Sequence, residues 1–224
     1  MRSSAILIGA VIVALAAGPS RGEVLLGVQA GGGYLRFDDL EDLWDEGGVN
    51  HHTDDLAFQW EVSATWRLAA RHALRASVER ISTSVQLYAV SDFGPPLGSA
   101  FLYSDQSFDT VPVSLGYEFT LRRSEGGAAT LAGVGVGYYI TELEGDQATY
   151  ADDPLVVGSL PYSREGDGYG FHGYLRQTAP ISERLSLTGM LRGRWADAMA
   201  FDDDGEIPVD FTDFDFALGV EWKI

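Results

Sequence analysis

The segment Phe58-Gln-Trp-Glu-Val-Ser-Ala-Thr-Trp-Arg-Leu68 alternates between apolar and polar residues over its whole length. Successive side chains of a β-strand point to opposite faces, so this period of two predicts a strand with one apolar and one polar face. Aromatic residues stand near both ends of the apolar face, and Glu61 and Arg67 share the polar face. Such a strand needs an apolar environment on one side and polar partners on the other.

The same alternation appears in seven further segments between Glu23 and the last residue. They span residues 24–34, 74–79, 110–121, 132–140, 169–176, 185–195 and 214–224. Two places predict irregularities. The alternation weakens at Arg80-Ile81, where we expect a bulge or an early strand end, and Pro112 favours a bulge or a position near the end of its strand. Eight amphipathic segments of period two predict an all-β, antiparallel fold.

The polar faces of these segments differ from the outer surface of a soluble β-sandwich. They carry glycine, hydroxyl residues, arginine and glutamate, with almost no lysine, and such a mixture suits a narrow interior in which charges pair. Aromatic residues gather near the ends of the apolar runs, as in the two interfacial girdles of membrane barrels. These residues are Phe58, Trp60, Trp66, Phe119, Tyr138, Trp195, Phe214 and Trp222. The pattern favours a membrane barrel over a soluble sandwich or a lipocalin-like barrel.

The connections between the segments alternate in length. The short ones are 69–72, 122–127 and 178–184, and the long ones are 38–55, 86–107, 143–167 and 196–213. Tight periplasmic turns opposite long extracellular loops are typical of outer-membrane barrels, and an even number of strands places both termini on the periplasmic side. We therefore expect an eight-stranded antiparallel up-and-down transmembrane β-barrel with short periplasmic turns and long extracellular loops.

Composition and the N-terminus set further bounds. The chain has 224 residues, which suits one domain, and its net charge of −18 disfavours nucleic acid as a partner. Residues 1–22 predict a signal peptide, with a positive start and an apolar stretch, cleaved between Ala16 and Gly22. The barrel domain would then span residues 23–224. The absence of cysteine excludes disulfides and thiolate metal sites.

The eight segments, the asymmetry of the connections and the ending Gly219-x-x-Trp222-x-Ile224 resemble the small eight-stranded outer-membrane barrels of the OmpX, OmpW and OmpA transmembrane-domain type. This resemblance covers the chain after the signal peptide. It implies a monomer in the outer membrane of a Gram-negative bacterium, in contact with membrane lipid and lipopolysaccharide. It also implies recognition by the barrel-assembly machinery, with Gly219, Trp222 and Ile224 as the sorting signal. Such signals usually end in Phe or Trp, from which Ile224 departs.

Charged residues on the inward faces predict an ion network in the lumen. Its expected members are Glu61, Arg67, Arg75, Glu79, Glu118, Arg176, Arg192, Arg194, Glu221 and Lys223. Because an eight-stranded barrel is only wide enough to be filled by side chains, we expect a structural plug, with a gate for small ions as the alternative. We expect Arg192 and Arg194 to pair with Glu221. The glycines of segments 24–34 and 132–140 predict a flattened barrel or a narrow water-filled cavity.

The sequence contains no strong metal or catalytic motif. Asp202, Asp203 and Asp204 are weak candidates for loosely bound Ca²⁺ or Mg²⁺, but the run does not fit an EF-hand loop. Barrel-shaped lipid A deacylases carry a His-x-Ser pair, which this chain lacks, and we expect no cofactor and no catalytic site. The expected role is a non-enzymatic structural or surface-interaction one of the OmpX type. A narrow small-solute or ion channel of the OmpW type is the alternative, and a lipid-modifying enzyme is less favoured.

Overall fold

The computed structural model describes residues 23–37, 50–53, 56–92, 99–151, 156–202, 205–208 and 210–224. Its strands are β1 (Val24–Arg36), β2 (Asn50–Thr53), β3 (Leu56–Ala69), β4 (His72–Asp92), β5 (Ser99–Arg123), β6 (Ala129–Ala151), β7 (Val156–Pro180), β8 (Leu185–Asp202), β9 (Gly205–Pro208) and β10 (Phe211–Lys223). Within this part of the chain, no helix is long and apolar enough to cross a membrane. The predicted signal peptide lies outside the described residues.

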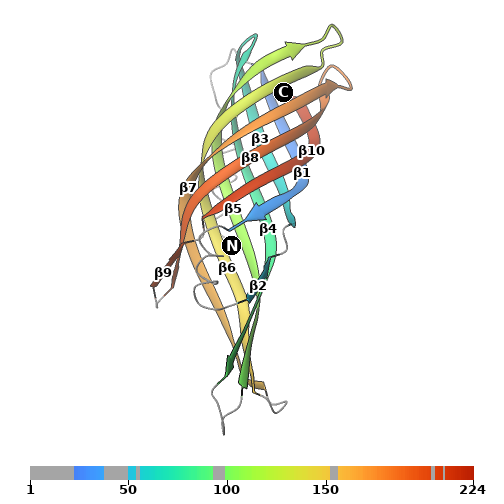
Figure 1. Cartoon of the computed structure of the whole chain (residues 1–224). Helices are drawn as coiled ribbons and strands as arrows, with labels where there is room; N and C mark the ends of the chain where they lie inside the picture. The colour runs from blue at the N-terminus through green and yellow to red at the C-terminus, as the bar shows by residue number, and fades with distance from the viewer. Residues whose placement is uncertain are drawn as a thin grey trace.

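Eight of the strands close into a barrel. The order is β10-β1-β3-β4-β5-β6-β7-β8, β8 pairs back to β10, and all of these pairings are antiparallel (Figure 1). The short strands β2 and β9 add to β4 and β8. The predicted eight-stranded up-and-down barrel is thus confirmed.

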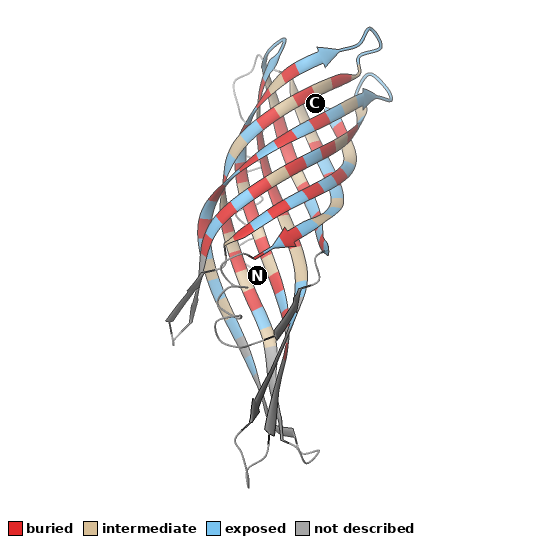
Figure 2. Cartoon of the chain, viewed as in Figure 1, coloured by how far each residue is buried: buried red, intermediate tan, exposed pale blue. Residues whose placement is uncertain are grey.

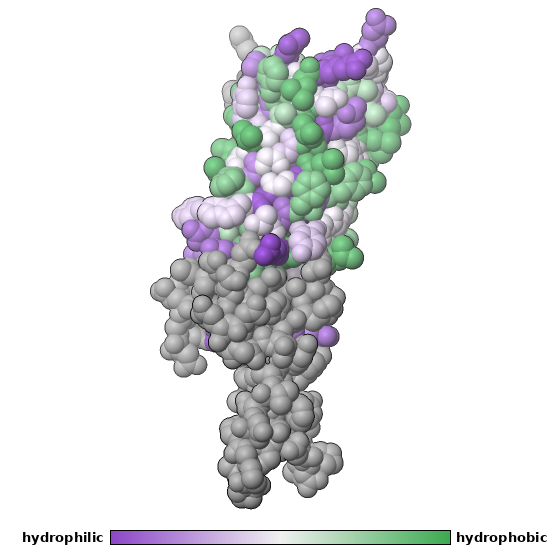
Figure 3. All heavy atoms as spheres, viewed as in Figure 1, coloured by the Kyte–Doolittle hydropathy of each residue, from purple (hydrophilic) through white to green (hydrophobic). Residues whose placement is uncertain are grey.

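The alternation of the sequence becomes an inside and an outside. In β10, Asp213 and Asp215 are buried while Phe214 and Phe216 between and beside them are exposed (Figure 2). Most other barrel strands show the same alternation, whereas in β3 and β4 the outward-facing Ala64, Ala76 and Val78 are buried as well. The exposed residues make the outer wall of the barrel largely apolar, and Figure 3 shows this apolar band on one face. An apolar surface of this extent would be unfavourable in water, and lipid is the environment that suits it.

Much of what the sequence predicted as long loops is strand. β4 continues to Asp92, and β5 already begins at Ser99. In the same way β6 continues to Ala151, β7 begins at Val156, and β8 continues to Asp202. These hairpins project beyond one end of the barrel (Figure 1). The prediction failed because alternation reports a difference between the two faces of a strand. A strand outside the membrane has no lipid-facing side and keeps its ladder without that difference.

Neither predicted irregularity occurs. β4 continues through Ile81, whose side chain is fully buried inside the barrel. Around Pro112 the β4–β5 register is unchanged, because Val78 pairs with Val113 and Ile81 pairs with Thr110. Proline lacks an N–H group, so the ladder is interrupted locally and needs no bulge.

Candidate functional site

Ion pairs fill a large part of the barrel lumen. The charged side chains involved are Arg75, Arg176, Arg192 and Arg194 with Glu61, Glu79, Glu118, Asp213, Asp215 and Glu221. None of these residues is more than 4% exposed. We call this set the ionic layer. Removing charges from water is costly, and only dense pairing of this kind makes such burial tolerable.

The part of the ionic layer nearer the short turns is centred on Arg75 and Arg176. Arg176 donates to Glu118 over 2.6 Å and also pairs with Glu221. Arg75 lies 3.3 Å from Glu221 and pairs with Glu61. Glu221 therefore joins the two arginines, and Glu61 connects them to the deeper part of the layer.

The deeper part is centred on the two arginines of β8. Arg192 donates to Asp215 over 2.9 Å, to Glu61 over 2.8 Å and to Glu79 over 2.6 Å. Arg194 donates to Asp213 over 2.5 Å and to Asp215 over 2.7 Å. Each arginine uses its planar fork to join several strands, which a lysine ammonium could not do with the same geometry.

Sequence reasoning missed three members of this deeper part. Gln59 accepts hydrogen bonds from Arg192 and Arg194 over 3.2 Å and 2.6 Å, while Asp213 and Asp215 bind the same two arginines. Asp213 falls within the connection predicted over residues 196–213, and Asp215 is not among the expected members of the network. The signal was available, since both lie on the same face of the last strand as Glu221.

Two predicted members lie outside the ionic layer. Arg67 contacts Glu23 over 2.8 Å with 37% of its side chain exposed, and Lys223 lies 3.4 Å from Glu23 with 49% exposed. Both stand at the ends of their strands beside the short turns, where the lumen opens to water. The alternation of the sequence predicted correctly that both side chains point inward, but it contained no information about how far from the end of the barrel they lie.

The predicted pairing of Arg192 and Arg194 with Glu221 is also wrong. The β8–β10 register places Asp215 opposite Arg192 and Asp213 opposite Arg194, whereas Glu221 lies opposite Ser186. Glu221 is contacted instead by arginines from β4 and β7 across the lumen.

Ring side chains occupy the space above the glycines of β6. A Cβ added at Gly133 would lie 2.1 Å from a ring atom of Tyr174, and one at Gly135 would lie 2.6 Å from His172 Nε2. The two rings are stacked with centroids 5.7 Å apart, and the Tyr174 hydroxyl donates to Glu118 over 3.1 Å. The glycine wall predicted to border a cavity is therefore covered by aromatic side chains.

Beyond the ionic layer, away from the short turns, a cluster of apolar side chains lies in the lumen. The buried residues there are Leu35, Phe37, Ala57, Ile81, Phe108, Tyr139, Leu143, Ala196, Ala198 and Phe211, and we call them the aromatic plug. Phe37 and Phe108 meet edge to face with centroids 4.6 Å apart, and Phe211 contacts both rings and Tyr139. The alternation of apolar and polar residues does not predict this plug, although an apolar residue on the inward face at Ile81 indicates it.

At the end with the short turns, the lumen begins as an open vestibule of about 260 Å³. Arg67, Arg123, Arg184 and Lys223 are among the residues that line it. A cavity of about 20 Å³ follows, lined in part by residues of the ionic layer. This is room for about one water molecule. Larger solutes that enter the vestibule meet packed side chains.

The predicted assembly signal has two parts with different surroundings. Trp222, on β10, and Ile224, directly after that strand, are both exposed. Gly219 faces inward, where an added Cβ would lie 2.0 Å from the Val28 carbonyl oxygen and 2.6 Å from the Gln29 side chain. The close packing against β1 therefore requires glycine at position 219, independently of any role in assembly.

The acidic candidates for a cation site lie mostly outside the described residues. Asp202 is the last residue of β8, and residues 203–204 lie outside the described residues. Among the residues that the structure describes, no group of three or more His, Asp or Glu side chains is arranged to hold a metal ion.

Comparison with solved structures gives the same fold. Neisserial surface protein A matches with a TM-score of 0.50 and 8% identity over 90% of this chain and 97% of its own. OprG from Pseudomonas aeruginosa matches with a TM-score of 0.50 and 13% identity over 91% of this chain and 96% of its own. The chain is a small eight-stranded outer-membrane β-barrel.

The apolar band and this fold together make the chain an integral protein of a Gram-negative outer membrane. Ail of Yersinia pestis is a further similar structure, with a TM-score of 0.49 and 10% identity over 91% of this chain and 99% of its own. No protein-family model matches the sequence, and no curated protein matches it. At these identities the likeness concerns the fold alone.

Proposed function

We propose that this barrel is non-enzymatic and does not conduct solutes, and that it anchors a protruding β-sheet for contacts at the cell surface. The observation that carries this proposal is the projection of β4, β5, β6 and β7 beyond the barrel (Figure 1). Residues 156–163 of β7 pair with β6 on one side, while the β7–β8 pairing begins only at Glu165.

A strand edge of this kind suits the addition of an extended peptide. Main-chain hydrogen bonds supply affinity in such complexes, and alternate side chains supply specificity. The filled lumen supports the same role, because the ionic layer and the aromatic plug stabilise the barrel as a rigid base. One of the similar structures is itself named a surface protein.

Cell-surface binding can be tested by placing charged residues on the unpaired edge of β7. Charged lysines on an edge strand oppose strand addition, so V157K/S159K should lower the retention of expressing cells on immobilised extracellular-matrix proteins. The control charges must avoid the lipid-facing wall, where residues such as Val136 and Leu175 lie, because a lysine there would be placed in lipid. S107K/T212K, at exposed positions of β5 and β10, adds the same two charges away from the edge. If cells that express the unmodified protein are retained no better than cells without the protein, the proposed role is contradicted.

The main alternative is a narrow channel, which the vestibule at the turn end favours. Single-channel recording of the refolded protein in a planar bilayer separates the two functions. We expect no current steps above the bare bilayer. Reproducible steps would instead support conduction through the lumen.

For membrane insertion itself, we propose lipid and lipopolysaccharide as the surroundings, a monomeric state, and recognition of Trp222 and Ile224 by the barrel-assembly machinery. The exposure of both side chains on the closing strand supports this recognition. The candidate Ca²⁺ or Mg²⁺ association of the acidic segment 202–204 stays a prediction, to be tested by calorimetric titration of the refolded protein.

A further inference from the structure

The end of the barrel with the short turns is basic, although the protein as a whole is strongly acidic. The chain has 15 basic and 33 acidic side chains. The basic residues at this end are Arg67, Arg71, Arg122, Arg123, Arg184 and Lys223. The acidic residues at the same end are Glu23, Glu125 and Glu183. The net charge of the turn end is therefore positive, whereas that of the whole molecule is negative.

The arginines are distributed around the rim. Arg71 lies in the β3–β4 turn, Arg122 and Arg123 end β5, and Arg184 lies in the β7–β8 turn. Each of the three hairpins that close at this end thus carries at least one exposed arginine. These four arginines form no ion pair with another described residue. We call them the arginine rim.

Backbone hydrogen bonds hold two of these positions at the rim. The Arg71 carbonyl oxygen accepts from Thr120 N over 2.9 Å, and the Arg184 carbonyl oxygen accepts from Lys223 N over 2.9 Å. Each bond ties a turn to the neighbouring strand. The backbone of both turns is therefore held against the barrel wall, and the side chains of Arg71 and Arg184 extend from defined points of the rim.

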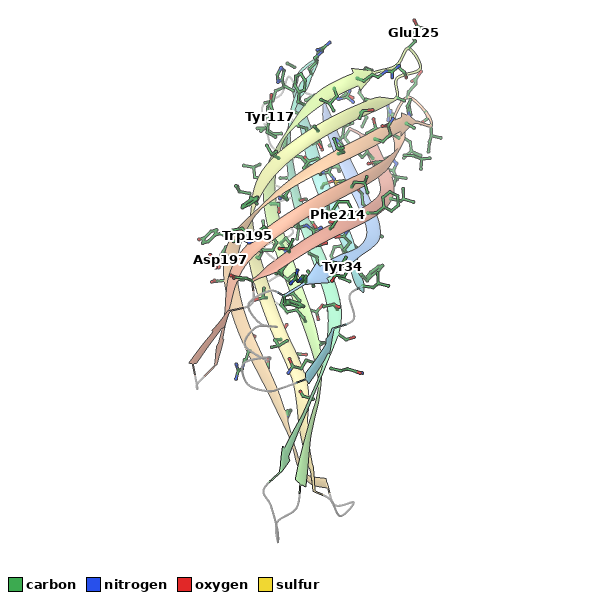
Figure 4. The ribbon with its side chains drawn as sticks, viewed as in Figure 1. Tyr34, Tyr117, Glu125, Trp195, Asp197 and Phe214 are labelled. Atoms are coloured by element: carbon green, nitrogen blue, oxygen red, sulfur yellow. The ribbon has the colours of Figure 1, made fainter. Side chains whose placement is uncertain are left out.

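The arginine rim borders the lipid-facing band directly. Leu121 immediately precedes Arg122 and is exposed on the outer wall. Tyr117, four residues earlier on the same strand, is exposed on that wall as well (Figure 4). In Figure 3, hydrophilic side chains gather at the turn end, next to the apolar band. Aromatic girdles mark the level of lipid headgroups. The rim is consequently placed at the headgroups of the periplasmic leaflet.

We propose that the arginine rim binds the phosphate groups of anionic phospholipids in the periplasmic leaflet. A guanidinium can donate two parallel hydrogen bonds to one phosphate, which favours arginine over lysine at such sites. A basic residue near an anionic membrane surface contributes about fivefold to association. Distribution over three successive turns beside the lipid band favours lipid over an anionic periplasmic polymer, which would contact one side of the rim.

Native mass spectrometry of the detergent-solubilised protein with phosphatidylglycerol or phosphatidylcholine tests the proposal. We expect the full-length mature protein to retain phosphatidylglycerol at least about fivefold better than phosphatidylcholine, on the basis of one engaged arginine. The variant R71Q/R122Q/R123Q/R184Q should lose most of this preference. The control variant R36Q/R164Q, with changes away from the turn end, should retain it. A heat-dependent gel shift verifies that both variants are folded.

Equal retention of the two lipids by the unmodified protein, or an unchanged preference in the rim variant, would overturn the proposal. Isolated peptidoglycan distinguishes the competing partner. Sedimentation of the unmodified protein with peptidoglycan, lost in the rim variant and without any lipid preference, would assign the rim to that polymer instead. Loss of the phosphatidylglycerol preference at high salt is expected, because exposed charges are screened.

Discussion

The ionic layer and the aromatic plug fill the same lumen in different ways. In the ionic layer, four arginines each contact at least two carboxylates, so every strand that contributes a charge is fixed relative to several others. In the aromatic plug, rings pack edge to face without directional bonds. Truncation of one side chain in the ionic layer leaves a buried charge without its partner, whereas truncation of a ring in the aromatic plug leaves a cavity.

This contrast explains why both kinds of layer occur in one narrow barrel. The ionic layer specifies register and partner choice, because a misplaced strand would leave buried charges without partners. The aromatic plug excludes water from the end of that layer and thereby strengthens its electrostatic interactions. Within the plug, the Tyr139 ring contacts Phe211 and covers Gly137, where an added Cβ would lie 3.0 Å from a ring atom.

The largest expected effect is the loss of a central arginine. Arg192→Met leaves Glu61, Glu79 and Asp215 each without one partner, which should cost about 3–5 kcal/mol of unfolding free energy. Urea unfolding of the refolded protein in lipid vesicles, followed by tryptophan fluorescence, measures this loss. Arg67→Met removes a partly exposed pair at the vestibule and should cost about 0–1 kcal/mol. Similar losses in both variants would contradict the depth difference between the two sites.

A large effect is also expected in the aromatic plug. Phe211→Ala removes a ring that contacts Phe37, Phe108 and Tyr139, and such truncations cost about 3–5 kcal/mol. The ionic layer should still block the lumen, so planar-bilayer recordings should show no new current. The lipid-facing Phe216→Ala serves as the control, because lipid can fill the space that it leaves. New conductance in the Phe211 variant would show that the plug alone closes the lumen.

A smaller effect tests the ring side chains above the glycines. Gly133→Ala places a methyl group 2.1 Å from the Tyr174 ring, and moving that ring should cost about 1–3 kcal/mol. Gly173→Ala is a matched control, because its Cβ would lie 3.9 Å from its nearest neighbour on β6, the Gly133 carbonyl oxygen. Urea midpoints of the two variants should therefore differ. Equal midpoints would mean that Tyr174 moves aside at little cost.

The smallest expected effect on the folded protein lies outside both layers. Ile224→Asp places a charge at the membrane interface on the outer face, which should cost about 0–1 kcal/mol. If the tail is the assembly signal, the amount of protein in the outer membrane should fall much more than this cost implies. Immunoblotting of outer-membrane fractions, compared with urea midpoints of the refolded variant, separates the two effects. Normal membrane levels would count against a recognition role.

Particular residues show where sequence reasoning succeeded. The alternation of Phe214, Phe216 and Leu218 with Asp213 and Asp215 separates a lipid-facing wall from an inward one, and the structure has both. Inward direction was likewise correct for Arg192 and Arg194. Direction follows from the period of two alone, because the pleat of a strand turns successive side chains to opposite faces.

Partner identity could not be obtained in this way. Arg192 meets Glu61 and Glu79, which are more than a hundred residues away along the chain, because the closed barrel brings β3, β4 and β8 to one level of the lumen. The same closure decides that Arg67 faces the vestibule, while Arg75 is buried among carboxylates. Strand tilt and register set these depths, and both depend on how all eight strands pair.

The sequence by itself determined the number of membrane strands, their two faces and the preference for a lipid environment, because each of these depends only on local alternation. The tertiary structure decided which charges pair, that rings cover the glycines of β6, and that Leu35, Ile81 and Phe211 meet in an apolar plug. Those features arise from contacts between distant segments. Such contacts exist only once the barrel has closed and fixed the relative height of every strand.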